Sequence, residues 1–193
     1  TKLETDRRRV RDQMSKLRRE LKDMARVRTT QRSARRRSGI PQVAIAGYTN
    51  AGKSSLLNRL TGADVLVENA LFATLDPTVR KARTPSGRDF TLADTVGFVR
   101  HLPHQLIEAF RSTLEEVSQA DVILHVVDGS DEAPEEQIDA VRTVLADIDA
   151  SNIPEIVVIN KADVADQLAL ARLRRREPNS LIVSAHTGEG FEE

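Results

Sequence analysis

The sequence predicts an α/β fold, in which a mainly parallel six-stranded sheet is covered by helices on both faces. Short apolar runs alternate with amphipathic segments along most of the 193 residues, a pattern typical of this class. The apolar runs are continuous rather than interrupted by polar residues, which favours strands buried on both faces. Residues with ligand-binding side chains follow these runs directly, at the carboxyl ends of the expected strands. Parallel sheets bind their ligands at these ends.

The expected strands lie at residues 42–46, 78–83, 89–93, 122–127, 155–159 and 180–184. Residues 86–87 (Ser-Gly) form a tight-turn sequence, so the second and third strands are expected to pair as a hairpin, with the second at the sheet edge. His125 is the one polar residue within its apolar run. We expect it to be buried and hydrogen-bonded.

The expected helices lie at residues 55–60, 105–119, 134–150 and 164–176, where apolar residues keep a helical spacing. In the first helix, Leu56, Leu57 and Leu60 are expected to face the core. Pro134 is expected in the first turn of its helix, the position where proline is best tolerated.

Residues 1–38 differ in composition from the rest and are interpreted as a long basic helix that precedes a domain at 39–193. Residues 2–36 lack Gly and Pro, and Val10, Met14, Leu17, Leu21 and Met24 are spaced as in a coiled-coil seam. We expect this seam to pack on another helix or on a second copy. Residues 1–38 hold 15 Lys and Arg against 5 Asp and Glu, a net charge of +10, while the remainder carries −10. The basic segment is therefore expected to contact a polyanion, unless it is merely a solvated surface.

Composition excludes several classes of function. The chain has no cysteine, so disulfides and thiol chemistry are excluded, and a cytoplasmic location is expected. No apolar run approaches the roughly 18 residues of a spanning helix, and the four histidines lack metal-ligand spacing. Because the chain begins at Thr1 and ends just after Gly190 where a further helix is expected, we interpret it as a fragment of a longer protein.

Residues 47–54 (GYTNAGKS) match the phosphate-binding pattern G-x-x-x-x-G-K-[ST], between a predicted strand and a predicted helix. Gly47 and Gly52 allow the backbone to turn with its N–H groups pointing inward, and the helix N-terminus adds a positive field. Lys53 is expected to lie between the last two phosphates and Ser54 to bind Mg²⁺. A chance glycine-rich turn is the alternative.

Two further motifs follow predicted strands. In residues 94–97 (DTVG), Asp94 is expected to hold Mg²⁺ through a water, and the Gly97 N–H to approach the terminal phosphate. In residues 160–163 (NKAD), Asp163 can accept hydrogen bonds from both N1–H and N2–H₂ of guanine, a pair of donors that adenine lacks. The Ala185 N–H, after the last strand, is expected to meet the guanine O6. Together these motifs predict a guanine-nucleotide site.

Three stretches resemble the HflX family of ribosome-associated GTPases, in the OBG–HflX-like branch of translation-factor-related GTPases: residues 47–54, 72–78 (FATLDPT) and 94–103 (DTVGFVRHLP). The resemblance implies a Ras-like GTPase domain that hydrolyses GTP to GDP and phosphate. It also implies binding to the large ribosomal subunit through ribosomal RNA, and the splitting or rescue of stalled ribosomes. Thr74 is implied as the second Mg²⁺ hydroxyl ligand, where the residues alone leave Thr74 and Thr78 as alternatives.

The expected mechanism places Lys53, Thr74 and Gly97 in catalytic roles, and Ser54, Thr74 and Asp94 (through water) at the metal. Phe98 takes the position where Ras-like enzymes place a water-orienting glutamine, which predicts slow intrinsic hydrolysis. Asn50 is similar to the asparagine of GTPases in which K⁺ replaces an arginine finger. The full-length protein is expected to be monomeric, and the alternative function is a nucleotide-gated RNA-binding module in which hydrolysis is incidental.

The residues expected to contact the nucleotide are Gly47, Tyr48, Thr49, Asn50, Ala51, Gly52, Lys53, Ser54, Ser55, Phe72, Ala73, Thr74, Leu75, Asp76, Asp94, Thr95, Val96, Gly97, Asn160, Lys161, Asp163, Ser184, Ala185 and His186.

Overall fold

The computed structural model describes residues 39–62, 78–95, 97–98 and 111–191. The chain divides into two compact units, Thr1–Ile40 and Pro41–Glu193, and almost all of the described residues belong to the second. The predicted basic helix therefore lies outside the described residues, as does the first part of the helix predicted at 105–119.

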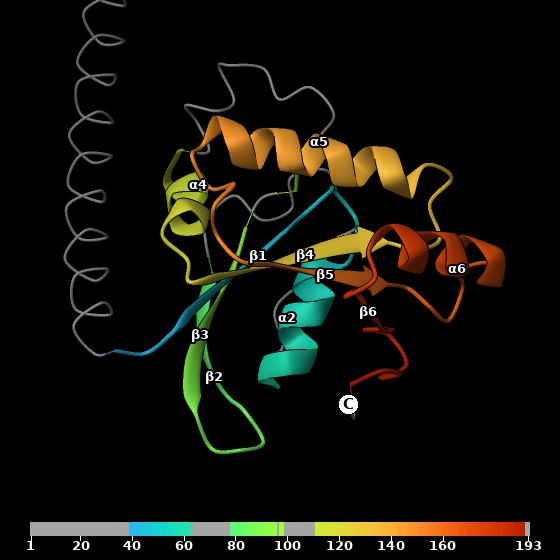
Figure 1. The fold of residues 1–193 in the computed structure, drawn as a ribbon. Coiled ribbons are helices and arrows are strands. Elements are labelled where there is room, and N and C mark those ends of the chain that lie inside the picture. The colour runs from blue at the N-terminus through green and yellow to red at the C-terminus, as the bar shows by residue number, and fades with distance from the viewer. Residues whose placement is uncertain (1–38, 63–77, 96, 99–110, 192–193) are drawn as a thin grey trace, which may run out of the picture. The chain divides into compact units, whose positions relative to one another are not determined.

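Six strands form one sheet in the order β2-β3-β1-β4-β5-β6 (Figure 1). β2 pairs with β3 in antiparallel register, and all other neighbouring strands are parallel, which confirms the predicted sheet and its hairpin at the edge. In chain order the elements are β1 (Gln42–Gly47), α2 (Lys53–Thr61), β2 (Thr78–Arg83), β3 (Asp89–Asp94), α4 (Arg111–Ser118), β4 (Val122–Asp128), α5 (Pro134–Asp147), β5 (Glu155–Asn160), α6 (Gln167–Arg176) and β6 (Leu181–Ile182).

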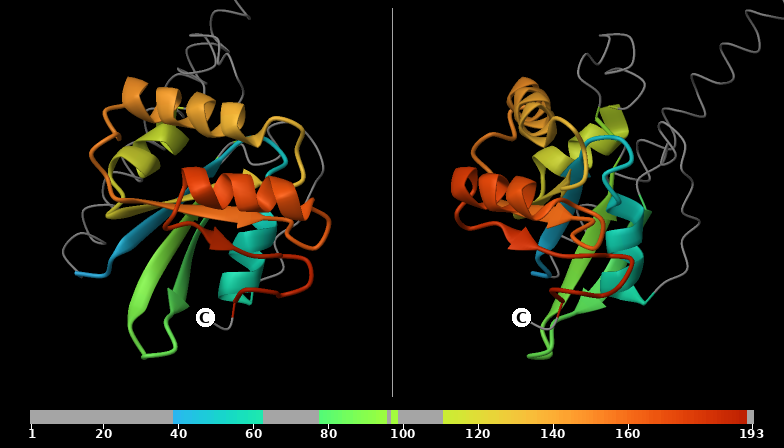
Figure 2. Two further views of the ribbon diagram at one scale, coloured as in Figure 1. Left: turned by 45° about the vertical axis from the view of Figure 1, so that its right-hand side comes forward. Right: turned by 90° about the vertical axis from the view of Figure 1, so that its right-hand side faces the viewer.

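Helices cover both faces of this sheet (Figure 2). α2 lies on one face, and α4, α5 and α6 lie on the other. The continuous apolar sequence of β1 follows from this arrangement, because successive side chains of a strand point to opposite faces. Ala44 and Ala46 pack with residues of α4 and α5, whereas Ile45 between them packs with Leu56 and Leu57 of α2.

The carboxyl ends of the parallel strands lie at the same end of the sheet, and the predicted motifs follow these strand ends. The phosphate loop follows β1, residues 94–97 follow β3, and residues 160–163 follow β5. In the strand register Ile45 lies opposite Asp94, and Asp128 at the end of β4 lies opposite Asn160. Sheet topology therefore brings together residues that are more than a hundred positions apart in the sequence.

Several element boundaries and side-chain exposures differ from prediction. α6 begins at Gln167 rather than 164, because the Asp166 carboxylate caps it by accepting from the N–H groups of residues 168 and 169. α5 ends at Asp147, and β6 spans only two residues. Leu60 shares the buried face of α2 but is 36% exposed near the end of that helix, and Ile156 of β5 is 39% exposed. The described part of the fold leaves this portion of the α2 face partly uncovered.

His125 is buried, as predicted, and belongs to a polar network that joins the sheet to α5 and to the end of α6. Its Nδ1 lies 2.5 Å from Glu155 Oε1 at 1% exposure. Arg142 of α5 donates to Glu155 and, through two further N–H groups, to Glu177. Burial acts to raise the pKa of Glu155, but hydrogen bonds from His125 and Arg142 outweigh it and lower that pKa from 4.5 to about 2.

The change Glu155→Gln is expected to lower the free energy of unfolding at pH 7 by about 1–3 kcal/mol, since it removes the ionised partner of two donors. The folded-state pKa lies below the ordinary value, so this stabilisation is complete above pH 4.5 and disappears as the pH falls toward 2. Urea denaturation at several pH values measures it. Asp89→Asn in the exposed hairpin, where Asp89 pairs with Lys81 and Arg83, is the control and should matter less. A deficit in Glu155→Gln that stayed constant down to pH 3 would contradict this account.

No helix among the described residues has both the length and the apolar character that crossing a membrane requires.

Candidate nucleotide-binding site

The phosphate loop between β1 and α2 is fixed by backbone hydrogen bonds to the segment that follows β3. The Thr49 N–H donates to the Phe98 carbonyl at 2.9 Å, and the Phe98 N–H donates to the Gly47 carbonyl at 3.0 Å. Asn50 and Gly52 both adopt left-handed backbone conformations, with φ of 61° and 94°. The loop therefore has a defined turn before α2 begins, as the sequence motif requires.

The glycines of the loop are also needed for close packing. A Cβ atom at Gly47 would lie 2.3 Å from the Val126 carbonyl oxygen, and one at Gly52 would lie 2.2 Å from Asn160 Nδ2. Both distances are far below van der Waals contact, so neither position accommodates a side chain without movement of the neighbouring residue. The sequence reasoning identified these glycines by their backbone freedom but not by this second constraint.

Lys53 is buried at the base of the loop, at 7% exposure. Its Nζ donates to the Tyr48 carbonyl at 2.9 Å. Burial lowers the pKa of Lys53 from 10.5 to about 8, and the negative charge of Asp94 acts in the opposite direction. An ammonium held in such surroundings gains much from an anionic partner, because two charges attract more strongly in a poorly solvated site.

Two of the predicted magnesium ligands meet in the structure. The Ser54 hydroxyl donates to Asp94 Oδ2 at 2.8 Å, and Asp94 is fully buried. A hydroxyl and a carboxylate oxygen beside a phosphate loop form a donor set that fits Mg²⁺, which prefers oxygen ligands and keeps part of its water shell. Thr74, the third predicted ligand, lies outside the described residues, together with Phe72, Ala73, Leu75 and Asp76.

Gly97 and Phe98 place their backbone against the loop. A Cβ atom at Gly97 would lie 2.7 Å from Thr49 Cα and 3.1 Å from Lys53 Nζ. The Thr95 hydroxyl donates to the Ile45 carbonyl at 2.6 Å, which holds this segment on β1. Phe98 is fully buried in the core beneath α4 and α5, so its ring does not face the site. Val96 lies outside the described residues.

The change Gly97→Ala is expected to reduce GTP hydrolysis by about tenfold or more, because the added methyl group displaces Thr49 or Lys53 and small misplacements of catalytic groups are costly. Single-turnover hydrolysis measures it. Gly87→Ala is a control for the loss of a glycine away from the site: a Cβ atom there meets nothing within 4 Å, and the strain from its φ of +86° stays within the exposed hairpin turn. Hydrolysis at the wild-type rate in Gly97→Ala would show that the close approach is not needed.

Asn160 joins the phosphate loop to the segment after β6. Its Nδ2 donates to the Ala51 carbonyl at 2.9 Å, and its Oδ1 accepts from the Ala185 N–H at 2.9 Å. The Ala185 N–H, which was predicted to meet the guanine O6, is thus paired within the protein, and its role toward a base stays a prediction. The sequence singled out Asn160 as part of a motif but gave no sign of these two connections.

Asp163 faces the same segment. Its Oδ1 accepts from the Ser184 hydroxyl at 2.7 Å, and its Oδ2 lies 3.7 Å from Nδ1 of the exposed His186. The Ser184 hydrogen bond is the main cause that holds the pKa of Asp163 below its ordinary value. The carboxylate is therefore ionised at neutral pH and oriented by Ser184.

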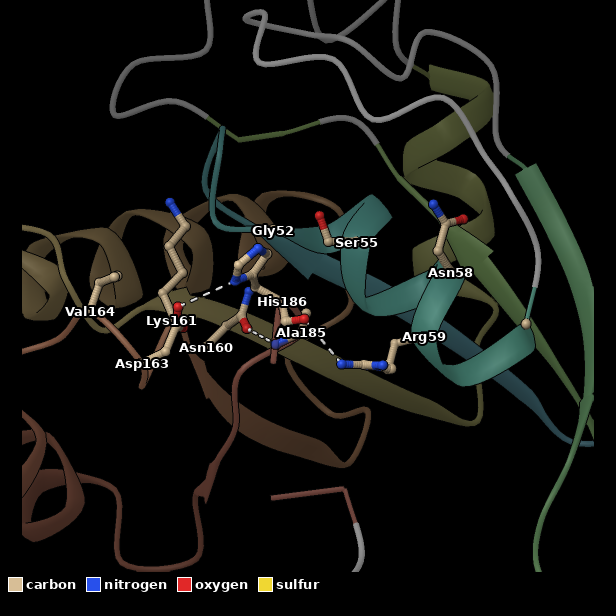
Figure 3. A pocket seen from close by; sticks show the side chains of 11 residues that line it. Gly52, Ser55, Asn58, Arg59, Asn160, Lys161, Asp163, Val164, Ala185 and His186 are labelled. Atoms are coloured by element: carbon tan, nitrogen blue, oxygen red, sulfur yellow. Dashed lines mark hydrogen bonds and ion pairs between the residues drawn. The ribbon is translucent and has the colours of Figure 1, made fainter. Parts of the chain in front are cut away.

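These residues line one open pocket of about 650 Å³ between α2 and the segments that follow β5 and β6 (Figure 3). Arg59 of α2 closes one side, because its Nη2 donates to the His186 carbonyl at 3.1 Å and its guanidinium lies 5.9 Å from the Phe191 ring centroid. The lining consists of Gly52, Ser55, Asn58, Arg59, Gly62, Asn160, Lys161, Asp163, Val164, Ala185 and His186. Asn58, Arg59, Gly62 and Val164 were not predicted, and no motif marks them.

Comparison with known proteins gives the family of the chain. Residues 42–161, which include the phosphate loop, Asp94 and Asn160, match the family model of the 50S ribosome-binding GTPases. The chain belongs to this family. The domain described above is thus the GTPase domain of a 50S ribosome-binding GTPase family member, and the Ras-like fold predicted from its motifs is confirmed.

Family members with curated names support the narrower resemblance. The chain is 54% identical over 166 residues to the GTPase HflX of Caldanaerobacter subterraneus subsp. tengcongensis, covering 86% of this chain and 39% of that protein. It is 45% identical over 193 residues to the GTPase HflX of Escherichia coli, covering 99% of this chain and 45% of that protein. The predicted resemblance to the HflX family is confirmed, and the chain spans less than half the length of these two relatives.

The fold of this chain is shared with a solved structure. The GTP-binding protein from the archaeon Sulfolobus solfataricus, in complex with GDP, matches with a TM-score of 0.62 at 27% sequence identity, over 86% of this chain and 54% of that chain.

Proposed function

We propose that the chain binds GTP with Mg²⁺ and hydrolyses it to GDP and phosphate. The observation that carries the proposal is Asn160, whose amide bridges the phosphate loop and the segment after β6. In this proposal Lys53 contacts the phosphates, Asp163 contacts the base, and the Asn160 bridge joins the two segments that carry them. The relatives named GTPase HflX and the solved GDP complex of a similar protein support it.

Each group of residues has a role in this proposal. Lys53 and the N–H groups of the phosphate loop neutralise charge on the phosphates, and Asp163 accepts from the guanine edge. Ser54 and Asp94, with Thr74, would hold Mg²⁺, which supplies further neutralisation of the developing charge. Asn50 of the phosphate loop would help to hold a K⁺ ion, which would also neutralise developing charge. Catalysis then consists mainly of positioning and electrostatic stabilisation.

We further propose that hydrolysis by the isolated chain is slow and is accelerated on the large ribosomal subunit. The buried ring of Phe98 follows D-x-x-G and offers no polar group to orient the attacking water. The basic residues 1–38 would add affinity for ribosomal RNA, because neutralising phosphates releases counterions. Splitting or rescue of stalled ribosomes is the cellular role that we infer from the resemblance.

The alternative is a nucleotide-gated RNA-binding module in which hydrolysis is incidental, and the buried Phe98 also fits this possibility. Nucleotide titration tests the guanine specificity that both functions share, and turnover with and without ribosomes separates them. Titration with GTP, GDP and ATP should show binding of both guanine nucleotides and rejection of ATP. Turnover with and without 50S subunits should then rise on the subunit, and swapping K⁺ for Na⁺ tests Asn50. ATP binding as tight as GTP binding would contradict the proposal, and turnover unchanged by ribosomes would favour the module.

A further inference from the structure

Lys161 lines the candidate pocket, but its ammonium group is paired outside the sequence motif. Lys161 Nζ lies 2.5 Å from Asp128 Oδ2, and the two side chains are 28% and 13% exposed. An ion pair that is partly shielded from water is stronger than one at an open surface. The methylene groups of Lys161 therefore extend from the end of β5 toward a fixed carboxylate at the end of β4.

The backbone of Lys161 gives a reason for this anchor. Its φ is +63°, a left-handed conformation that a non-glycine residue adopts at an energetic cost. The next residue, Ala162, donates its N–H to the Val183 carbonyl at 3.1 Å, so the backbone is held on the last strand. A long side chain that leaves a constrained backbone at the wall of a pocket can still adopt many rotamers unless its far end is bound.

Asp128 is itself held in place by the turn that follows β4. Its Oδ1 accepts from the Ser130 N–H at 2.9 Å and from the Ser130 hydroxyl at 2.6 Å. The Gly129 N–H donates to the Asn160 carbonyl at 2.9 Å, and Asp128 lies opposite Asn160 in the strand register. One carboxylate oxygen therefore fixes the turn, and the other is available to Lys161.

We propose that Asp128 is a positioning residue for guanine-nucleotide binding, an inference that rests on the function proposed above. Asp128 holds the Lys161 ammonium at the end of β4, so that the apolar stem of Lys161 forms a wall of the pocket for a planar base. Without this carboxylate, the Lys161 side chain has to become ordered when the nucleotide binds. Affinity then falls, because ordering a flexible side chain opposes binding.

The change Asp128→Asn tests the proposal, because it keeps the shape and the acceptor for Ser130 and replaces the charged oxygen that faces Lys161 with an amide NH₂ group. We expect the Kd for GDP to rise about tenfold, which corresponds to a coupling of about 1.4 kcal/mol. The single-turnover rate of GTP hydrolysis at saturating GTP should not change, since Asp128 does not contact the phosphates. Fluorescence anisotropy of labelled GDP gives the Kd, and thermal unfolding checks that the variant is folded.

A double-mutant cycle shows whether Asp128 acts through Lys161. In a Lys161→Met background, Asp128→Asn should weaken GDP no further. Asp131→Asn is the matched control, because it makes the same charge change in the same turn, where the Asp131 carboxylate accepts from the Ala133 N–H at 2.9 Å. Its Kd should equal that of the wild type.

Two results would overturn the inference: an unchanged Kd in Asp128→Asn, or an equal loss with and without Lys161, which would show that Asp128 acts only through the turn. Wild-type protein that bound no GDP at all would instead contradict the proposed function.

Discussion

Replacing Lys53 with methionine is expected to reduce GTP hydrolysis by about 10²–10³-fold, the usual effect of removing one group that stabilises transition-state charge. Lys53 Nζ lies within the phosphate loop, 2.9 Å from the Tyr48 carbonyl and close to Gly97. Methionine is unbranched like lysine, is one atom shorter and carries no charge. Because burial already disfavours the charged form of Lys53, as its lowered pKa shows, the variant should not be less stable than the wild type.

Single-turnover hydrolysis and thermal unfolding measure these two effects separately. Lys81→Met in the exposed β2–β3 hairpin is the matched control, and its hydrolysis rate should equal that of the wild type. Hydrolysis within threefold of the wild-type rate in Lys53→Met would exclude Lys53 from catalysis. A fall in stability together with activity would instead assign Lys53 a role in folding.

Replacing Asp163 with asparagine is expected to weaken GTP binding by about 10²-fold or more. A site that lacks the hydrogen-bond partner of a polar group on the ligand rejects that ligand strongly. The carboxylate accepts two hydrogen bonds, whereas an amide offers one acceptor and one donor. This pattern matches xanthine, which has a carbonyl in place of the guanine 2-amino group. The variant should therefore gain affinity for XTP as it loses affinity for GTP.

Competition binding with GTP and XTP measures this exchange. Asp166→Asn is the matched control, because asparagine retains the capping function of Asp166 at the start of α6 and leaves the pocket unchanged. An Asp163→Asn protein that bound GTP and XTP equally weakly would show general disruption of the pocket. An Asp163→Asn protein that still preferred GTP would show that other residues contact the guanine edge.

The sequence predicted those features that depend on local pattern. Ala44, Ile45 and Ala46 were identified as a buried strand because the run is apolar, and the phosphate loop because residue types and spacing suffice to define it. The start of α6 was misplaced by three residues, because the apolar spacing extends back to Val164 while the Asp166 carboxylate decides where the helix begins.

Other features of the site depend on contacts between distant strands, which no local pattern records. The ion pair between Asp128 and Lys161 arises because β4 and β5 are neighbours in a particular register. The hydrogen bond from Arg59 to the His186 carbonyl joins residues 127 positions apart. The slow hydrolysis expected from Phe98 stays a prediction, and only the packed core explains why a large apolar residue stands at this position.

The two hydrogen bonds of the Asn160 amide have a consequence for fragments of the ligand. One side chain is hydrogen-bonded both to the loop that we propose to contact the phosphates and to the segment that we propose to contact the base. Guanosine alone or pyrophosphate alone should contact only one of these two segments. The other segment would then remain free to move. The intact molecule restrains both segments at once, so its affinity should exceed what the separate affinities of its two halves would suggest.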